Sequence, residues 1–146
     1  MSLIENRKAK FNYEITEKFE AGIELLGFEV KSVKNKHGNI DSAFVIIRGG
    51  EAYLIGAFIP PYQQNNTPEG YDPYRNRRIL LTKKEIKELA DLEKSKSLTI
   101  VPLSMYNKGR KIKLAIAVAK GKKKFDKRET IKKRETERDI RRSLKN

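Results

Sequence analysis

The chain contains no cysteine, no tryptophan and a single histidine, His37. Without cysteine it forms neither disulfides nor a thiolate metal site. With a single histidine and no cysteine, a transition-metal centre is not expected, because such centres use several nitrogen or sulfur ligands. No apolar run reaches the roughly 18 residues that a membrane-spanning helix needs. The first ten residues also lack an apolar stretch followed by a small-residue cleavage site, which argues against secretion. These absences favour a cytoplasmic protein without a metal or cofactor.

Signals of catalysis are also sparse. His37 precedes Gly38-Asn39, a pattern typical of a surface turn. Glu20, Glu24 and Glu29 leave a carboxylate-only magnesium site, as in a small nuclease, as an alternative, although scattered acids in a chain that is 36% charged usually face solvent. We therefore predict that the chain is not an enzyme. Three serines lack a nearby base in a recognised nucleophile motif: Ser32, Ser42 and Ser104.

Positive charge is what the chain has in abundance: 33 Lys and Arg against 19 Asp and Glu, a net charge of +14. Residues 120–146 hold thirteen of these bases and five acids, with almost no apolar face. Such a tail cannot bury enough apolar surface to fold alone, but it can neutralise phosphates and release their counterions. Ile131 and Ile140 would lie on opposite helix faces, which argues against a lipid surface. We predict a tail that is disordered when free and folds on binding RNA or DNA.

Two further clusters of basic residues support binding to a polyanion. They are Asn6-Arg7-Lys8-Ala9-Lys10 and Arg75-Asn76-Arg77-Arg78. Aromatic residues offer a second way to bind nucleic acid, because base–aromatic stacking tolerates any sequence. Two roles are open for these aromatic residues: they stack on bases, or they close the ends of a barrel. The residues are Tyr62, Tyr71, Tyr74, Tyr106 and Phe125.

Apolar periodicity predicts mainly strands in the first part of the chain. The alternation over 11–15 predicts a half-buried strand that continues over 19–26 after a bend at residues 21–22. Over 27–34 the period of two is lost, and the spacing of Val30 and Val33 predicts a short helix.

Two hairpins follow, each made of β-prone runs around a glycine turn. The first joins 40–48 to 51–59 through Gly49-Gly50, and the second joins 98–106 to 111–119 around Gly109. In the last run Ile112, Leu114, Ile116 and Val118 share one face.

Between the hairpins, residues 63–76 predict a long mobile loop, and Thr82 with Glu85 forms a capping box for a helix over 83–94. The pattern as a whole predicts a mostly β fold: a small antiparallel barrel of the oligonucleotide-binding (OB) type with two to three short helices. We place this barrel in residues 1–121 and the basic tail in residues 122–146.

Seven motifs occur in one order along the chain: Asn6-Arg7-Lys8-Ala9, Glu20-Ala21-Gly22-Ile23, Gly27-x-Glu29-Val30-Lys31-Ser32, Pro61-Tyr62, Asp72-Pro73-x-Arg75-x-Arg77, Val101-Pro102-Leu103 and Ala119-Lys120-Gly121-Lys122-Lys123-x-Phe125-Asp126-Lys127-Arg128. In these motifs the chain resembles the bacterial SsrA-binding protein (small protein B, SmpB) family, from Asn6 to about Leu144. Phe125 departs from the Tyr or His common there, and Gly109 lies one place before the expected Asn-Gly turn.

The resemblance implies an RNA-binding adaptor for ribosome rescue. It would bind the tRNA-like domain of transfer-messenger RNA (tmRNA, also SsrA RNA) and deliver it to stalled ribosomes for trans-translation. The barrel would take the place of the missing anticodon arm. The tail would enter the empty mRNA channel as a helix and meet small-subunit RNA at the decoding centre. Elongation factor Tu would be a partner through charged tmRNA, and the protein would act as a monomer.

The alternative function is a generic basic ribosome-associated RNA-binding protein without tmRNA selectivity.

The resemblance also implies which residues meet RNA. Under the adaptor interpretation we expect the Glu29 carboxylate to hydrogen-bond a ribose or base edge. The RNA-binding residues expected on the barrel are Asn6, Arg7, Lys8, Glu29, Lys31, Ser32, Lys113 and Lys120. Those expected on the ribosome-binding tail are Lys122, Lys123, Lys124, Phe125, Asp126, Lys127 and Arg128.

Overall fold

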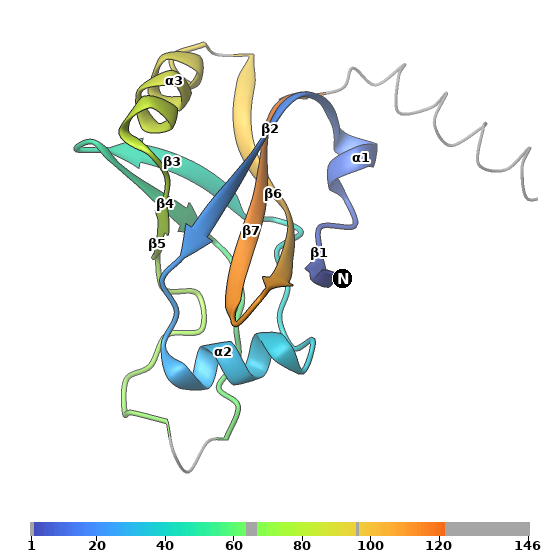
Figure 1. Ribbon diagram of the computed structural model, residues 1–146. Coiled ribbons are helices and arrows are strands. Elements are labelled where there is room, and N and C mark those ends of the chain that lie inside the picture. The colour runs from blue at the N-terminus through green and yellow to red at the C-terminus, as the bar shows by residue number, and fades with distance from the viewer. Residues whose placement is uncertain (1, 64–66, 96, 122–146) are drawn as a thin grey trace, which may run out of the picture.

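Strands dominate the computed structural model, which describes residues 2–63, 67–95 and 97–121 (Figure 1). Its strands are β1 (Ser2–Glu5), β2 (Tyr13–Ile23), β3 (Phe44–Arg48), β4 (Glu51–Ile55), β5 (Arg77–Leu80), β6 (Leu98–Lys108) and β7 (Lys111–Gly121). Its helices are α1 (Ala9–Asn12), α2 (Gly27–Lys34) and α3 (Lys83–Glu93). The mostly β, antiparallel class predicted from the sequence is confirmed, while the predicted tail, 122–146, lies outside the described residues.

The sheet closes on itself. Its strand order is β1-β6-β3-β4-β5-β2-β7, and β6 also pairs with β7, so that six strands form a ring. Strand β1 pairs with residues 104–106 of β6, farther along this strand than its pairing with β3. The β2–β7 and β6–β7 ladders run along nearly the whole length of these strands. In contrast, the described register between β3 and β6 is the pair Val45 and Ile100. Long ladders therefore join β7 to β2 and to β6, whereas a narrow seam joins β3 to β6.

Helix α3 reinforces the narrow seam. It packs against β3 and β6, and Glu93 at its last turn accepts a hydrogen bond from the backbone N–H of Ile47 at 2.8 Å. The second carboxylate oxygen of Glu93 pairs with Arg48 at 2.7 Å. A strand N–H that has no strand partner is thus satisfied by a helix side chain, as buried backbone groups require.

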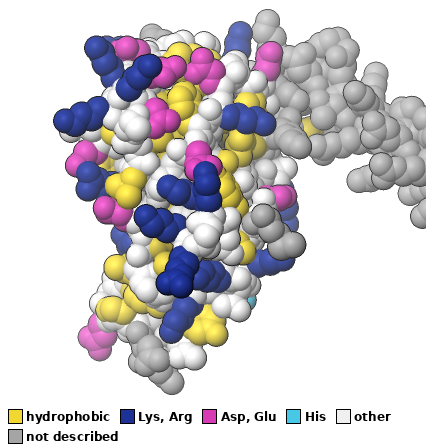
Figure 2. Space-filling model, in the orientation of Figure 1, with side chains coloured by type: hydrophobic (Ala, Val, Ile, Leu, Met, Phe, Trp, Pro, Cys, Tyr) yellow, Lys and Arg dark blue, Asp and Glu magenta, His cyan; other side chains and the backbone are white. Residues whose placement is uncertain are grey.

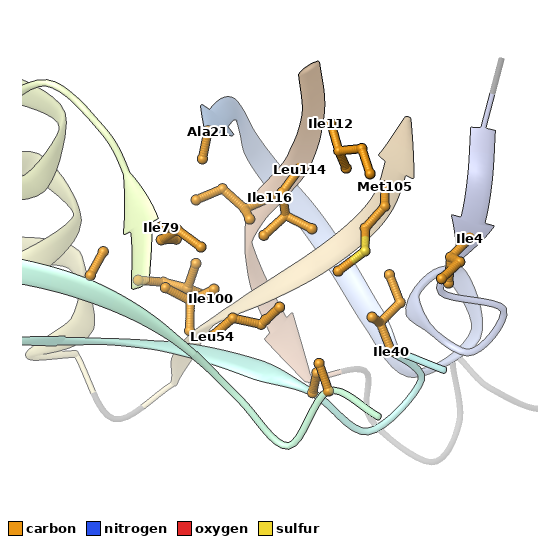
Figure 3. Packing of buried hydrophobic residues seen from close by; sticks show 14 of the residues in the cluster. Ile4, Ala21, Ile40, Leu54, Ile79, Ile100, Met105, Ile112, Leu114 and Ile116 are labelled. Atoms are coloured by element: carbon orange, nitrogen blue, oxygen red, sulfur yellow. The ribbon is translucent and has the colours of Figure 1, made fainter. Parts of the chain in front are cut away.

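A continuous cluster of apolar side chains fills most of the barrel interior (Figure 3). The four residues of β7 that the alternation assigned to one face are all buried there. Leu54, Ile79, Ile100 and Met105 meet them from the other strands. Ala117 and Ala119, on the opposite face of β7, are also fully buried.

Several predicted elements match the structure. Helix α2 has the predicted bounds, and α3 begins at the predicted capping box, where Thr82 Oγ1 accepts the Glu85 N–H at 3.2 Å. The hairpin turn at Gly49 and Gly50 has φ values of 59° and 75°, which glycine adopts without strain.

Two features of the strands differ from the prediction. Phe11 lies in α1, and β2 runs through residues 21–22 without a break, its register shifting between Ile15 and Glu17 instead. The sequence also did not reveal β5. Its alternation is concealed because Arg77 takes an interior position while Leu80 is 47% exposed.

We predict that Ile116→Ala lowers the free energy of unfolding by about 2–5 kcal/mol, because a fully buried side chain leaves a cavity. Ile46→Ala makes the same chemical change at a partly exposed position of β3 and should cost less than half as much. Urea denaturation followed by circular dichroism measures both. Equal losses would contradict the assignment of the core.

Candidate nucleic-acid interface

Helix α2 lies across one end of the barrel (Figure 1) and turns a polar residue inward. Glu29, Ser32 and Val33 are its buried residues, each with 0% exposure. One Glu29 oxygen accepts the N–H of Leu26 at 2.7 Å, which satisfies an amide that the first turn of the helix leaves free. Glu29 therefore caps its own helix while pointing into the protein.

The Glu29 carboxylate is enclosed by two arginines. Arg77 donates to Oε2 from Nη2 at 2.6 Å and from Nε at 2.9 Å. Arg75 donates to Oε1 from Nη2 and to Oε2 from Nε at 3.1 Å. The Arg77 side chain is completely buried, and that of Arg75 is 30% exposed. Two forked guanidinium groups thus hold one carboxylate, an arrangement that fixes orientation as well as charge.

The remaining donors of Arg77 reach backbone carbonyls of the segment that follows β4. They bind Ala57 at 2.8 Å, and Pro73 and Arg75 at 3.0 Å each. The Tyr71 hydroxyl lies 2.8 Å from both Glu29 Oε2 and the Ile59 carbonyl, and it accepts from Arg77 at 3.0 Å. The part of the predicted mobile loop from residue 71 onward is therefore tied to the barrel.

Electrostatics favour the charged form of Glu29. Burial alone would raise the pKa of Glu29, but hydrogen bonds from Arg75, Leu26, Tyr71 and Arg77 outweigh it and lower the pKa to about 2. Burial and the neighbouring Glu29 charge raise the pKa of Tyr71 to about 12. At neutral pH the cluster holds a carboxylate, a protonated phenol and two guanidinium ions.

Partners within the protein engage several of the charged residues singled out in the sequence. The Glu29 carboxylate binds Leu26, Tyr71, Arg75 and Arg77, and its expected contact with a ribose or base edge stays a prediction. Arg75 and Arg77, grouped above as a polyanion-binding cluster, instead neutralise Glu29. Arg78 is exposed and pairs with Glu51 at 3.0 Å and with Glu24 at 3.6 Å.

Ser32 also turns away from solvent. Its side chain is buried, and its hydroxyl donates to the Pro60 carbonyl. Ser32 and Glu29 join α2 to the chain on either side of residues 61–70. The contact with RNA expected of both residues stays a prediction.

The N-terminal motif lies near the other end of α2. Asn6 is tied to the barrel, since its amide donates to the Pro102 carbonyl at 2.8 Å. Arg7 is exposed and pairs with Asp41 at 3.4 Å, and Lys8 is exposed. Arg7 and Lys36, just beyond α2, line a shared hollow of about 310 Å³.

A second hollow lies along α2 on the side of the β6–β7 hairpin. Its volume is about 340 Å³, and Ile23, Leu25 and Val30 are among its apolar residues. The bases that line it are Arg110, Lys111 and Lys113. Figure 2 shows Lys and Arg side chains gathered over this hairpin tip and α2.

The described residues predicted to bind RNA therefore divide into groups. Arg7 and Lys8 present charge beyond the C-terminal end of α2, Lys31 is exposed on α2, and Lys113 lines the second hollow. Lys120 is exposed near the far end of β7, where it pairs with Glu14 and Leu98. Arg110 and Lys111, which follow Gly109 at the predicted turn, were not among the residues predicted to bind RNA. The tail residues 122–128 lie outside the described part.

The acids proposed for a magnesium site are separated by their partners. Glu20 pairs with Lys108 at 2.8 Å and accepts from Tyr106, and these bonds lower the pKa of Glu20. Glu24 pairs with Arg78, and Glu29 with the buried arginines. Within the described ranges no three His, Cys, Asp or Glu side chains gather in a metal-binding group. None of the helices described there is long and apolar enough to cross a bilayer.

A closed antiparallel barrel with a basic helix across one end defines a nucleic-acid-binding class of fold. Comparison with known proteins then gives the family. The SmpB protein family model matches residues 3–146, so the chain belongs to the SmpB family.

Similar proteins cover nearly the whole chain. An SsrA-binding protein of Mesoplasma florum is 53% identical over 96% of this chain and 94% of its own length. Another, from Gloeothece citriformis, is 47% identical over 98% of this chain and 92% of its own. A chain in the solved structure "tmRNA-SmpB: a journey to the center of the bacterial ribosome" superposes with a TM-score of 0.69 at 40% identity, over 82% of this chain and 84% of that one.

We predict that Glu29→Gln lowers the free energy of unfolding at pH 7 by about 3–5 kcal/mol, because Arg77 is left buried with its charge unmatched. A lowered pKa stabilises the fold above the unfolded-state value near 4.5, and this contribution is lost as the pH falls toward 2. The difference in free energy of unfolding between wild type and variant should therefore shrink by about 3 kcal/mol between pH 6 and pH 2.

Glu24→Gln is the matched control, since Glu24 is 54% exposed and its pair with Arg78 lies at the surface. It should change stability by less than about 1 kcal/mol at either pH. Urea titrations over a pH series provide the measurement. A gap for Glu29→Gln that stays constant with pH would show that the carboxylate is not charged in the fold.

Proposed function

We propose that this chain is an RNA-binding adaptor for ribosome rescue, which binds the tRNA-like domain of tmRNA and delivers it to stalled ribosomes for trans-translation. The observation that carries the proposal is the full-length match to the SmpB family and to SsrA-binding proteins. The superposed structure, tmRNA-SmpB, adds RNA and the bacterial ribosome as partners. The barrel supplies a fitting surface, because the described residues that line the hollow along α2 include three bases and no acid, whereas the hollow near Lys36 holds Arg7 and Lys36 together with Glu5 and Asp41.

In this proposal the exposed and the buried motif residues have different tasks. Arg7, Lys8, Lys31 and Lys113 contact phosphates of the RNA, which gives affinity and orientation. Asn6, Glu29 and Ser32 act indirectly, because their side chains bind other parts of the protein. No step of this function requires bond making or breaking by the protein.

The tail has a separate task in the proposal. Residues 122–146 enter the empty mRNA channel and meet small-subunit RNA, with Lys120 at the junction to the barrel. Elongation factor Tu joins through charged tmRNA. The compartment is the cytoplasm, where ribosomes translate. The strong basic charge of 122–146 supports this division, since contact with ribosomal RNA is favoured by counterion release.

The test that separates this function from generic basic RNA binding is selectivity under salt. Binding to tmRNA is measured across a salt series with an unrelated structured RNA as competitor. We expect tight binding at physiological salt that resists the competitor, because shape and base contacts persist when phosphate attraction is screened. Binding that collapses equally for both RNAs would favour the generic alternative.

We predict that deleting residues 130–146 leaves tmRNA affinity within about threefold of the full chain and abolishes rescue of stalled ribosomes. The reason is that the barrel holds the RNA-binding surface, and the deleted segment would act only on the ribosome. Filter binding and a reconstituted trans-translation assay measure the two effects. Parallel loss of affinity and rescue would contradict the separation of tasks.

A further inference from the structure

A small hollow lies at the start of α2, and of its lining residues only Lys31 has been given a task in the proposed function. It measures about 270 Å³ and is lined by Gly27, Phe28, Lys31, Tyr62 and Gln63. Two aromatic rings and a lysine thus border one space, between α2 and the chain that follows Pro60-Pro61. Tyr62 is 42% exposed, so its ring is accessible from solvent.

One wall of the hollow is fixed by the buried cluster. Phe28 packs edge-on against Tyr71, with ring centroids 4.7 Å apart and planes at 85°. The hydroxyl of Tyr71 is in turn held by Glu29, Arg77 and the Ile59 carbonyl. The Phe28 ring is thereby set in place before any ligand arrives, which lowers the entropy cost of binding.

The lining determines the chemistry of a ligand. Aromatic faces favour a flat ring, and Lys31 favours a neighbouring negative charge. Among the residues that the structure describes, no acidic side chain lines the hollow. Its volume is slightly below the roughly 300–1,000 Å³ of pockets for whole small ligands, so it suits one ring system whose remainder stays outside. A nucleobase with its phosphates beside Lys31 meets these conditions.

We propose that this hollow receives a single unpaired base of the bound RNA, which stacks on Tyr62 while Lys31 contacts the adjoining phosphate. The inference rests on the proposed function, since it names a subsite for the same RNA. It also gives Glu29 an indirect role in RNA binding, exercised through Tyr71 and Phe28.

Tyr62→Ala and Tyr62→Trp test the stack. The RNA is the tRNA-like domain of tmRNA, with 2-aminopurine placed at each unpaired position in turn. Loss of the ring should weaken binding roughly tenfold without changing the salt dependence, and Trp should restore it. At one position the fluorescence of 2-aminopurine should be quenched by the wild type and by Tyr62→Trp, but not by Tyr62→Ala. Lys31→Ala should instead lower the salt slope by about one.

Tyr74→Ala is the matched control. Tyr74 is 56% exposed and lies outside the hollow, with its ring centroid 5.1 Å from that of Phe58. It should leave the quenched position unchanged, and circular dichroism verifies the fold of each variant. Unaltered affinity and quenching in Tyr62→Ala would overturn the subsite even though the wild type binds tmRNA selectively. Normal RNA binding with loss of rescue would also overturn it and assign the hollow to a ribosomal or protein partner. Failure of wild-type selectivity would instead overturn the proposed function.

Discussion

The ion pair between Glu29 and Arg77 is completely enclosed by protein, with both side chains at 0% exposure. Removing two charges from water costs several kcal/mol per ion, and only good geometry with further hydrogen bonds compensates for it. Here those bonds are present: Arg77 donates to three carbonyls and Glu29 accepts from Leu26, Tyr71 and Arg75. Among the described residues, no buried side-chain nitrogen or oxygen lacks a partner.

This pair connects parts of the chain that are far apart in sequence. Glu29 belongs to α2, and Arg77 is the first residue of β5. Backbone carbonyls between β4 and β5 accept hydrogen bonds from Arg77. An apolar pair of similar volume could fill the same space, often at no loss of stability. It would not orient Tyr71 and the carbonyls of the loop. Through Tyr71 and Phe28 the pair also orients one wall of the hollow that Lys31 and Tyr62 line.

Much of the fold could be read from the sequence, because alternation and glycine turns are local signals. The β6–β7 hairpin, α2 and the capping box of α3 all follow such rules. Strand β5 could not be read, since a buried arginine and an exposed leucine reverse the usual pattern. The basic cluster at 75–78 was misassigned for the same reason: charge in a sequence does not show whether its partner is a phosphate or a buried carboxylate. The resemblance groups the motif residues as RNA-binding, but a motif does not show which side chains are buried, as those of Glu29 and Ser32 are.

We propose that Glu29 supports RNA binding through the residues that it holds, without touching RNA itself. A solved structure of this chain bound to the tRNA-like domain of tmRNA tests it most directly. We expect the Glu29 carboxylate to keep its bonds to Arg75, Arg77 and Tyr71, with no RNA atom within hydrogen-bonding distance of it. A complex in which Arg77 has released Glu29 and the carboxylate binds a ribose or base edge would contradict this indirect role.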